Sequence, residues 1–294
     1  MRITLTGATG FLGTELIGLL RREGHDLRFL SRRAPESPAH FAWDPLAGPP
    51  PAASLEGCDA VIHLAGEPVA QRWTNDVKRK IRLSRVQGTN NLVAALAALP
   101  ARPKTLICAS AIGYYGSRGG DILTESSPAG SGFLPEVCVE WERAAGAARA
   151  LGIRVVTPRI GVVLGKEGGA LQKMLPPFRL GIGGPLAGGH QWMSWIHVED
   201  MVRLIAFAAN SEALNGAVNA VSPEPVTNAG FTRALGAALH RPASFPVPEF
   251  ALRALYGEMA GILLDSQRAI PAAAQSAGFQ FLHPDLAETL RGLL

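Results

Sequence analysis

Short apolar runs alternate with amphipathic stretches along the first 165 residues. The runs that predict buried strands are 2–6, 26–32, 59–66, 104–110 and 153–161. Between them, helical periodicity predicts a helix at 10–24, closed by Gly24, and a longer one from about 75 to 99. Strands that alternate with helices form a parallel sheet with right-handed crossovers. The pattern therefore predicts an α/β fold.

The pattern changes after Gly165. The stretch 178–195 is rich in glycine and carries Trp192 and Trp195. A helix at 198–210 and a strand at 216–222 follow, and the remainder is mostly helical by pattern, with proline-rich joints. We expect two domains. One is 1–165, with 196–222 returning to it in part; the smaller, mostly helical one is formed by 166–195 and 223–294 and would hold a substrate.

A glycine-rich stretch, TGATGFLG at 6–13, lies between the first predicted strand and helix. Gly7 suits a tight turn, Gly10 leaves room for a pyrophosphate, and Gly13 allows close packing of helix and sheet. The helix N-terminus offers free N–H groups to phosphate. A purely structural glycine turn is the alternative, but the strand–turn–helix context favours a dinucleotide site in a Rossmann-type doubly wound parallel sheet. The expected cofactor contacts here are Gly7, Thr9, Gly10, Phe11, Leu12 and Gly13.

The end of the second strand indicates which dinucleotide is bound. The residues there are Ser31, Arg32 and Arg33, where an NAD site usually has a carboxylate for the ribose 2′-hydroxyl. A carboxylate would repel a 2′-phosphate, whereas guanidinium groups bind it. We therefore expect NADP(H) as the cofactor; the alternative is that the arginines only form a solvated loop.

Composition narrows the function classes. The chain has 294 residues, 47% of them hydrophobic and 18% charged, as expected for a globular protein with a sizeable core. Its net charge of +4 is scattered without a basic run, which argues against a nucleic-acid partner. The three cysteines show no pairing or metal-binding spacing, and no apolar run is long enough for a membrane span. We expect a cytoplasmic protein with no metal site and no membrane partner.

Several segments together resemble a known family. These are TGATGFLG at the start, VIHLAG (61–66), VQGTNNLVAAL (86–96), PRIGVVLG (158–165) and WIHVEDMV (195–202). They resemble the extended short-chain dehydrogenase/reductases, the NAD-dependent epimerase/dehydratase family. The asparagine that commonly opens the third motif is Arg85 here. The resemblance also implies cofactor contacts from His63, Leu64, Ala65, Gly66 and Arg159.

Four further segments narrow the resemblance to one subgroup. They are 65–89, 109–116, 190–200 and 263–286. They resemble epimerase-family proteins that end in a domain of unknown function and are sometimes labelled cell-division inhibitors. Relatives often dimerise through the two helices beside the active site, so the resemblance implies that a homodimer would use 75–99 and 134–150.

The family's catalytic pair is missing. The resemblance implies a Ser or Thr, a Tyr and, four residues later, a Lys that act together in proton transfer. Glu142 lies 17 residues before Arg159, the usual family spacing, which puts Leu134 at the tyrosine position and Cys138 at the lysine position. Residues 128–150 contain no Tyr and no Lys. Aligning on Tyr115 also puts alanine at the family's serine position, with Ser110 one residue earlier.

Two functions remain open. The first is an NADP(H)-dependent oxidoreductase or isomerase of unknown small-molecule substrate, with a non-standard proton donor. The candidate catalytic residues are Ser110, Tyr114, Tyr115 and Glu67, each of which is about equally well explained by packing or a surface hydrogen bond. Cys138 is better explained as a small buried hydrophobic residue than as a catalyst. The second function is a non-catalytic NADP(H) sensor, which would explain the missing pair directly. An RNA-binding role is a weaker third reading because there is no basic patch.

Overall fold

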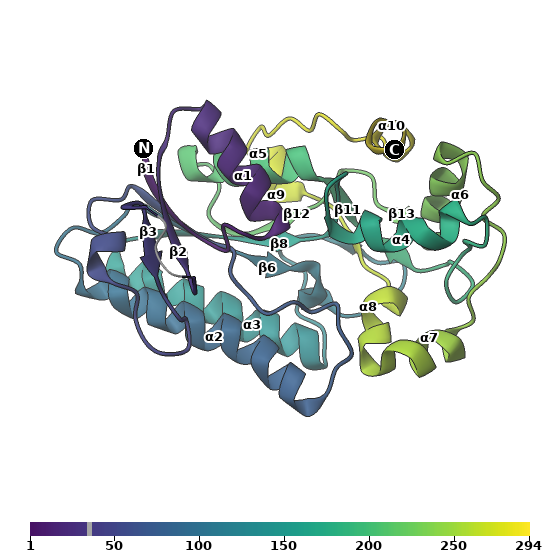
Figure 1. The fold of residues 1–294 in the computed structure, drawn as a ribbon, viewed down its shortest axis with the longest axis horizontal. Helices are drawn as coiled ribbons and strands as arrows, with labels where there is room; N and C mark the ends of the chain where they lie inside the picture. The colour runs from purple at the N-terminus through teal and green to yellow at the C-terminus, as the bar shows by residue number, and fades with distance from the viewer. Residues whose placement is uncertain (34–36) are drawn as a thin grey trace.

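The apolar runs of the N-terminal half form one parallel sheet. The computed structural model describes residues 1–33 and 37–294. The strands lie in the order β12-β8-β5-β4-β1-β2-β3, and β6 pairs with β8 (Figure 1). Their bounds are β1 (Arg2–Thr6), β2 (Asp26–Ser31), β3 (His40–Ala42), β4 (Ala60–His63), β5 (Thr105–Cys108), β6 (Ser110–Ala111), β8 (Arg154–Ile160) and β12 (Gly216–Ala220). The predicted strands of this half are therefore confirmed: β1 has the predicted bounds, and the ends of the other four differ from the prediction by at most three residues.

Helices cover both faces of the sheet. In Figure 1, α1 (Phe11–Arg22) and α5 (Val198–Asn210) lie above it, and α2 (Asn75–Ala98) and α3 (Phe133–Gly146) lie below it. The upper core contains Leu16, Leu20 and Ile205, and the lower core contains Leu92 and Trp141. A buried leucine or isoleucine contributes about 1.5–3 kcal/mol of hydrophobic free energy, so these layers hold the sheet. The doubly wound Rossmann-type fold is thus confirmed.

The strand order reverses at β1. The chain runs from β1 outward to β2 and β3 on one side, then returns to β4 and continues outward to β5 and β8 on the other. Ligands in open parallel sheets bind in the crevice beyond the carboxyl ends of the strands at such a switch point. The ends of β1, β2 and β4 therefore frame the candidate cofactor site.

The C-terminal region is mostly helical, as predicted. Its elements are β9 (Val162–Leu164), α4 (Gly169–Arg179), β10 (Trp192–Met193), β11 (Trp195–His197), β13 (Val226–Thr227), α6 (Asn228–Ala238), α7 (Glu249–Tyr256), η4 (Gly257–Ala260), α8 (Gly261–Leu264), β14 (Arg268–Ala269), α9 (Ala272–Ser276) and α10 (Leu286–Leu293). Leu171, Phe231, Leu235 and Leu290 pack in a separate core between its helices. Two other residues, Ala274 and Phe279, enter the core of the large sheet instead. The chain end thereby ties the helical region to the sheet.

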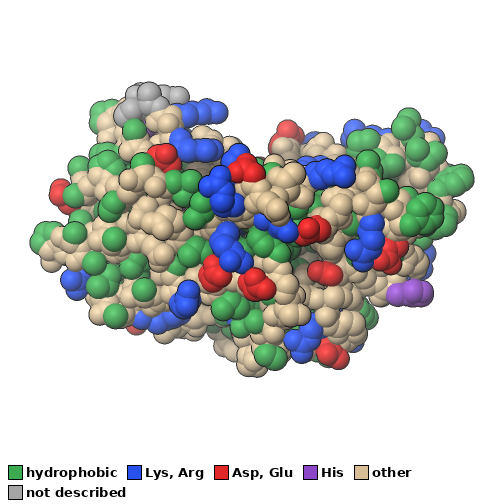
Figure 2. Space-filling model, turned by 90° about the horizontal axis from the view of Figure 1, so that it is seen from below, with side chains coloured by type: hydrophobic (Ala, Val, Ile, Leu, Met, Phe, Trp, Pro, Cys, Tyr) green, Lys and Arg blue, Asp and Glu red, His purple; other side chains and the backbone are tan. Residues whose placement is uncertain are grey.

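The remaining short elements connect these layers. They are η1 (Ala52–Ser54), η2 (Ile112–Tyr115), β7 (Ile122–Leu123), which pairs with β14, and η3 (Ala147–Leu151). Positive and negative side chains are interspersed over the lower face of the molecule (Figure 2). Several pair on or beside α2, for example Lys80 with Asp76 at 2.8 Å and Arg82 with Glu136 at 3.1 Å. Among the described residues, no helix is long and apolar enough to cross a membrane.

Candidate cofactor and active site

The turn between β1 and α1 requires its glycines. Gly7 has a φ of +75°, and a Cβ there would lie 2.8 Å from the carbonyl carbon of Leu64. A Cβ on Gly13 would lie 2.8 Å from the Cα of Ala8. Both positions exclude side chains, so the turn packs closely against the end of β4. Thr9 and Gly10 are exposed at the N-terminus of α1.

The first turn of α1 is open to a ligand. Gly10 is the N-cap residue, and no side chain caps the helix. The first N–H groups of a helix have no intrahelical acceptor, and they carry the positive end of the helix dipole. A phosphate at this end would satisfy them. The geometry therefore fits the pyrophosphate site predicted from the glycine pattern.

Thr6 and His63 fix the ends of β1 and β4 beside this turn. The Thr6 hydroxyl accepts a hydrogen bond from the Ala65 N–H at 3.1 Å and shares one of 2.7 Å with His63 Nδ1. Burial lowers the pKa of His63 to about 4, so the ring is neutral at pH 7. Its Nε2 has no hydrogen-bond partner among the described residues. His63 thus shapes the loop 64–66 that borders the crevice.

Phe11 extends the site toward the C-terminal region. Its ring occupies the space that a Cβ on Gly165 or Gly168 would need; at Gly168 that Cβ would lie 2.6 Å from the ring. The first residue of α1 therefore packs against the loop between β9 and α4. The neighbouring Leu12, also expected at the cofactor, is half-buried and packs on the sheet core.

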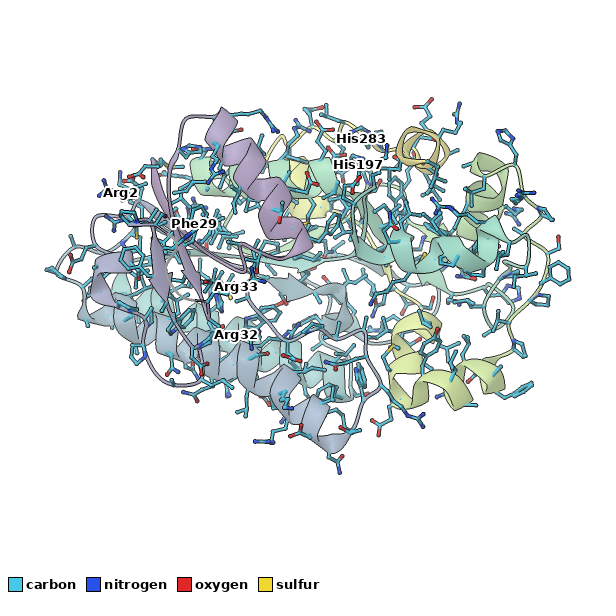
Figure 3. The ribbon with its side chains drawn as sticks, viewed as in Figure 1. Arg2, Phe29, Arg32, Arg33, His197 and His283 are labelled. Atoms are coloured by element: carbon cyan, nitrogen blue, oxygen red, sulfur yellow. The ribbon has the colours of Figure 1, made fainter. Side chains whose placement is uncertain are left out.

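Two exposed arginines lie at the end of β2. Arg32 and Arg33 are exposed, and neither forms a hydrogen bond or ion pair within the described parts of the chain. Figure 3 places both labelled residues beyond the carboxyl end of β2. Ser31 is half-buried, and its carbonyl accepts from the Trp43 N–H at 2.8 Å. The guanidinium groups are thus available to a 2′-phosphate.

Glu142 and Arg159 form a buried ion pair between α3 and β8. Arg159 Nε donates to Glu142 Oε1 at 2.8 Å, and Nη2 donates to Oε2 at 2.9 Å. Ser110 donates to the same Oε1 at 2.7 Å. Burial by itself would lower the pKa of Arg159, but Glu142 outweighs it and the pKa is raised. The Ser110 hydroxyl and the Arg159 charge are therefore committed to this network.

The two candidate tyrosines lie in different surroundings. Tyr115 is fully buried; its hydroxyl donates to Asn219 Oδ1 at 2.7 Å and accepts from Arg159 Nη1 at 2.9 Å. Burial raises the pKa of the Tyr115 phenol. Tyr114 is half-buried, its ring lies 3.5 Å from the Arg159 guanidinium carbon, and its hydroxyl bonds to no described residue. Of the two phenols, only that of Tyr114 is available to a ligand.

The face of α3 carries no proton-transfer group at the two family positions. Leu134 is half-buried, and its Cβ lies 3.5 Å from where a Cβ on Gly113 would be. Burial raises the pKa of the Cys138 thiol to about 11, and Glu142 acts in the same direction. The thiol is therefore protonated at neutral pH and behaves as a small apolar side chain.

Glu67 and Arg85 meet beyond the loop that follows β4. Glu67 is half-buried; its N–H donates to Ser84 Oγ at 3.0 Å, and its carbonyl accepts from Arg85 Nη1 at 2.9 Å. Its carboxylate accepts a hydrogen bond from Gln71 Nε2 at 3.4 Å. Sequence reasoning did not place Arg85 or Thr6 in the site. For Arg85, the available signal was an arginine in place of the family's usual asparagine. For Thr6, it was a threonine at the end of an apolar strand.

One group of potential metal ligands lies elsewhere. Among the described residues it consists of His197, Glu199 and His283. The Glu199 N–H donates to His197 Nδ1, and the Glu199 carboxylate pairs with His283 Nε2 at 2.9 Å. The two rings lie 3.8 Å apart, well away from Arg32 and Arg33 in Figure 3. These contacts explain the cluster as an anchor between α5 and the chain end.

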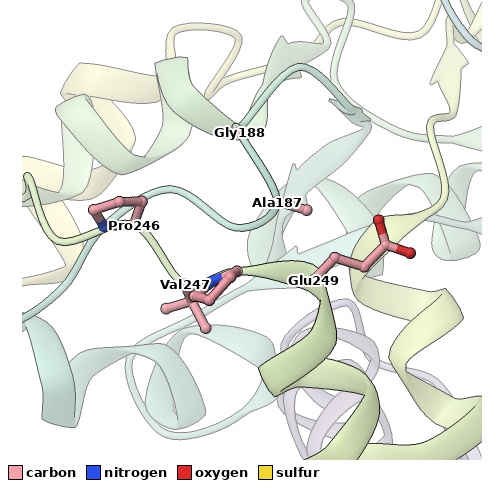
Figure 4. Close-up of a pocket in the computed structure, with 6 residues that line it drawn as sticks. Ala187, Gly188, Pro246, Val247 and Glu249 are labelled. Atoms are coloured by element: carbon pink, nitrogen blue, oxygen red, sulfur yellow. The ribbon is translucent and has the colours of Figure 1, made fainter.

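Two hollows lie in the C-terminal region, away from the switch point. The first, about 490 Å³, is lined by Ala187, Pro246, Val247 and Glu249 (Figure 4). The second, about 430 Å³, shares Ala187 and Glu249 with it and reaches Gly119 and Gly120 in the loop after η2. Tyr114 lines neither hollow.

Comparisons with known proteins agree with this arrangement. The sequence profile of the NAD dependent epimerase/dehydratase family matches residues 3–220, and that of the domain of unknown function DUF1731 matches 247–293. This chain is 40% identical to an Arabidopsis thaliana protein named epimerase family protein SDR39U1 homolog, chloroplastic. The alignment covers 100% of this chain and 87% of that protein.

Two solved structures share the fold across essentially the whole chain. The human epimerase family protein SDR39U1, crystallised with NADPH, is 36% identical with a TM-score of 0.90, covering 100% of this chain and 99% of that one. A nucleoside-diphosphate sugar epimerase from Corynebacterium glutamicum is 35% identical with a TM-score of 0.81, covering 99% of this chain and 57% of that one. The predicted resemblance is therefore confirmed: this chain belongs to the NAD dependent epimerase/dehydratase family, in the group that ends in DUF1731.

Proposed function

We propose that the protein binds NADP(H) and transfers hydride between the nicotinamide and a small organic substrate. The cofactor choice rests on two features: the α1 N-terminus has no side-chain cap, and the exposed side chains of Arg32 and Arg33 follow β2. The first suits a pyrophosphate and the second a 2′-phosphate. The NADPH in the human relative's crystal structure supports the same choice.

We further propose that Tyr114 carries the proton in this reaction. Bound NADPH would supply a hydride to an electrophilic carbon, and the oxygen on that carbon would then need a proton. Among the candidate residues, Ser110 and Tyr115 donate into the buried network of Glu142 and Asn219. Tyr114 is half-buried on η2, and its hydroxyl forms no hydrogen bond with any described residue. Its phenol is the group best placed to donate to a substrate oxygen and to recover the proton from solvent.

The test is an assay of NADPH oxidation, which is measured as the loss of NADPH absorbance. Purified protein is mixed with NADPH and a panel of aldehydes, ketones, quinones and enones. We expect oxidation above background with at least one class and a fall in kcat of at least about tenfold in Tyr114→Phe, since general acid catalysis contributes about 10²–10⁴-fold. Tyr256→Phe, the same change on α7, is the matched control and should retain full activity. Unchanged kcat in Tyr114→Phe would remove Tyr114 from the mechanism.

A non-catalytic NADP(H) sensor is the second candidate. It is favoured by the face of α3, where a leucine and a buried protonated thiol stand at the two family positions. A sensor binds the cofactor without turning it over. Firm NADPH binding with no oxidation across the whole panel would support this candidate over the enzyme.

A further inference from the structure

Arg85 is a half-buried cation beside the cofactor crevice. It comes from α2, and its Nη1 donates to the carbonyls of Glu67 at 2.9 Å and Ile81 at 3.3 Å. Its guanidinium carbon lies 5.0 Å from the centre of the Trp141 ring. A Cβ on Gly66 would be 3.2 Å from that carbon and 3.3 Å from each terminal nitrogen, so the group lies flat against the Gly66 backbone. The guanidinium is thus held in one place.

Within residues 1–33 and 37–294, the Arg85 guanidinium takes part in no ion pair. Burial lowers the pKa of Arg85, although Cys138 and Glu67 act in the opposite direction. A guanidinium has five N–H donors, and the hydrogen bonds here use one of its three nitrogens. A half-buried cation with spare donors is only partly solvated, and a ligand with oxygen acceptors would satisfy those donors.

The position of Arg85 follows from the glycine turn. Gly7 contacts Leu64 and Ala65 at the end of β4, and the next residue, Gly66, lies on the guanidinium. A dinucleotide whose pyrophosphate lies at the N-terminus of α1 directs its two ribose rings to opposite sides of the switch point. Arg32 and Arg33 lie on the β2 side of β1, whereas Arg85 lies beyond β4, on the other side. Arg85 is therefore on the side left for the nicotinamide half.

We propose that Arg85 binds the nicotinamide ribose of NADP(H), donating hydrogen bonds to its hydroxyl groups and supplying the fixed positive charge that α3 lacks at Cys138. The proposal rests on the proposed function, because it assumes that the crevice holds NADP(H). Arg85 is a binding residue on this account, and its guanidinium is oriented by Gly66, Trp141 and the Glu67 carbonyl.

A comparison of two ligands tests the proposal. NADPH contains the nicotinamide ribose, whereas adenosine 2′,5′-bisphosphate contains only the adenine half with its 2′-phosphate. We expect Arg85→Met to raise the Kd of NADPH by at least about tenfold and to leave the Kd of the bisphosphate within about twofold. Arg82→Met is the matched control; Arg82 lies one turn earlier on α2 and pairs with Glu136 and Glu140 at the surface. It should leave both constants unchanged.

A second variant keeps the test decisive where Arg85→Met does not fold. Gly66→Ala leaves Arg85 in the chain but forces the guanidinium to shift by a few tenths of an ångström. We expect it to weaken NADPH and spare the bisphosphate in the same way. Equal losses for both ligands, or no loss for either, would overturn the role of Arg85. Failure of the wild-type protein to bind either ligand would instead overturn the proposed function.

Discussion

Glu142 holds Arg159 by two parallel hydrogen bonds, at 2.8 and 2.9 Å, across the junction of α3 and β8. The side chains are 16% and 4% exposed, so the pair is largely shielded from water. Arg159 also donates a hydrogen bond to the Tyr115 hydroxyl, and this hydroxyl donates one to Asn219 on β12. The residues near the absent catalytic pair therefore form a structural clamp across four elements, α3, β8, η2 and β12.

Breaking this clamp should destabilise the fold. Glu142→Gln keeps the shape of the side chain but leaves the Arg159 charge buried and unpaired. Removal of one partner from a buried pair typically costs about 3–5 kcal/mol, and we expect a loss of that order in the free energy of unfolding by urea.

Glu140→Gln is the control for this variant, because Glu140 forms a more exposed pair with Arg82 at 3.4 Å. Exposed pairs contribute about 1 kcal/mol or less. Equal stability of the Glu142 and Glu140 variants would show that the clamp contributes nothing beyond a surface contact.

Replacing glycine by alanine should have opposite effects at Gly13 and at Gly18, both on α1. A Cβ at Gly13 meets the backbone of the turn, whereas a Cβ at Gly18 meets only the end of the Arg22 side chain at 3.5 Å. Gly13→Ala should therefore abolish measurable NADPH binding in a fluorescence titration. Gly18→Ala should retain it and stabilise the fold by about 0.5–1 kcal/mol, because alanine favours helix. Full NADPH binding by Gly13→Ala would contradict the described turn.

The exposed arginines at the end of β2 should set cofactor preference. Replacing Arg32 and Arg33 together by alanine is expected to raise the Kd of NADPH at least about tenfold, since it removes charge-assisted bonds to the 2′-phosphate. NADH lacks this phosphate, so its Kd should change less than about twofold. The control replaces Arg79 and Lys80 on α2 by alanine, removing the same charge from an exposed place. If both double variants weakened NADPH equally, the effect would be one of net charge alone.

His63 should make stability depend on pH in a defined window. Its pKa falls from 6.5 to about 4 on folding because the ring is buried. A lowered histidine pKa means that the unfolded chain binds the proton more tightly. The contribution is therefore complete above pH 6.5 and is lost as the pH falls toward 4, by up to about 3 kcal/mol.

Urea unfolding at several pH values measures this dependence. His63→Gln should flatten the decline between pH 6.5 and 4 relative to the wild type, while His190→Gln, at an exposed position, should not. An unchanged slope in His63→Gln would show that other groups cause the decline.

Local physics explains why so much of the fold could be predicted. The turn at Gly7, the helix that follows it and the apolar strands depend on neighbouring residues, and they were found within a few positions. The short strand β3 was not predicted, because it has only three residues, two of them half-buried and one exposed, too few for a recognisable apolar run. Fold class and family were both readable from such patterns.

The active-site contacts could not be predicted in the same way. Ser110 meets Glu142 across 32 residues, and Arg85 meets Gly66 through the packing of α2 against the end of β4. Neither spacing carries a periodic signal. Sequence alone also gave Tyr114 and Tyr115 equal standing, since only burial shows that the second phenol is engaged by Asn219.

The measurement that tests the central claim most directly is a fluorescence titration of the wild-type protein with NADPH and with NADH at the same ionic strength. We predict that NADPH binds at least about tenfold more tightly, through the phosphate-binding turn and the arginines at the end of β2. Equal or tighter binding of NADH, or no binding of either, would contradict it.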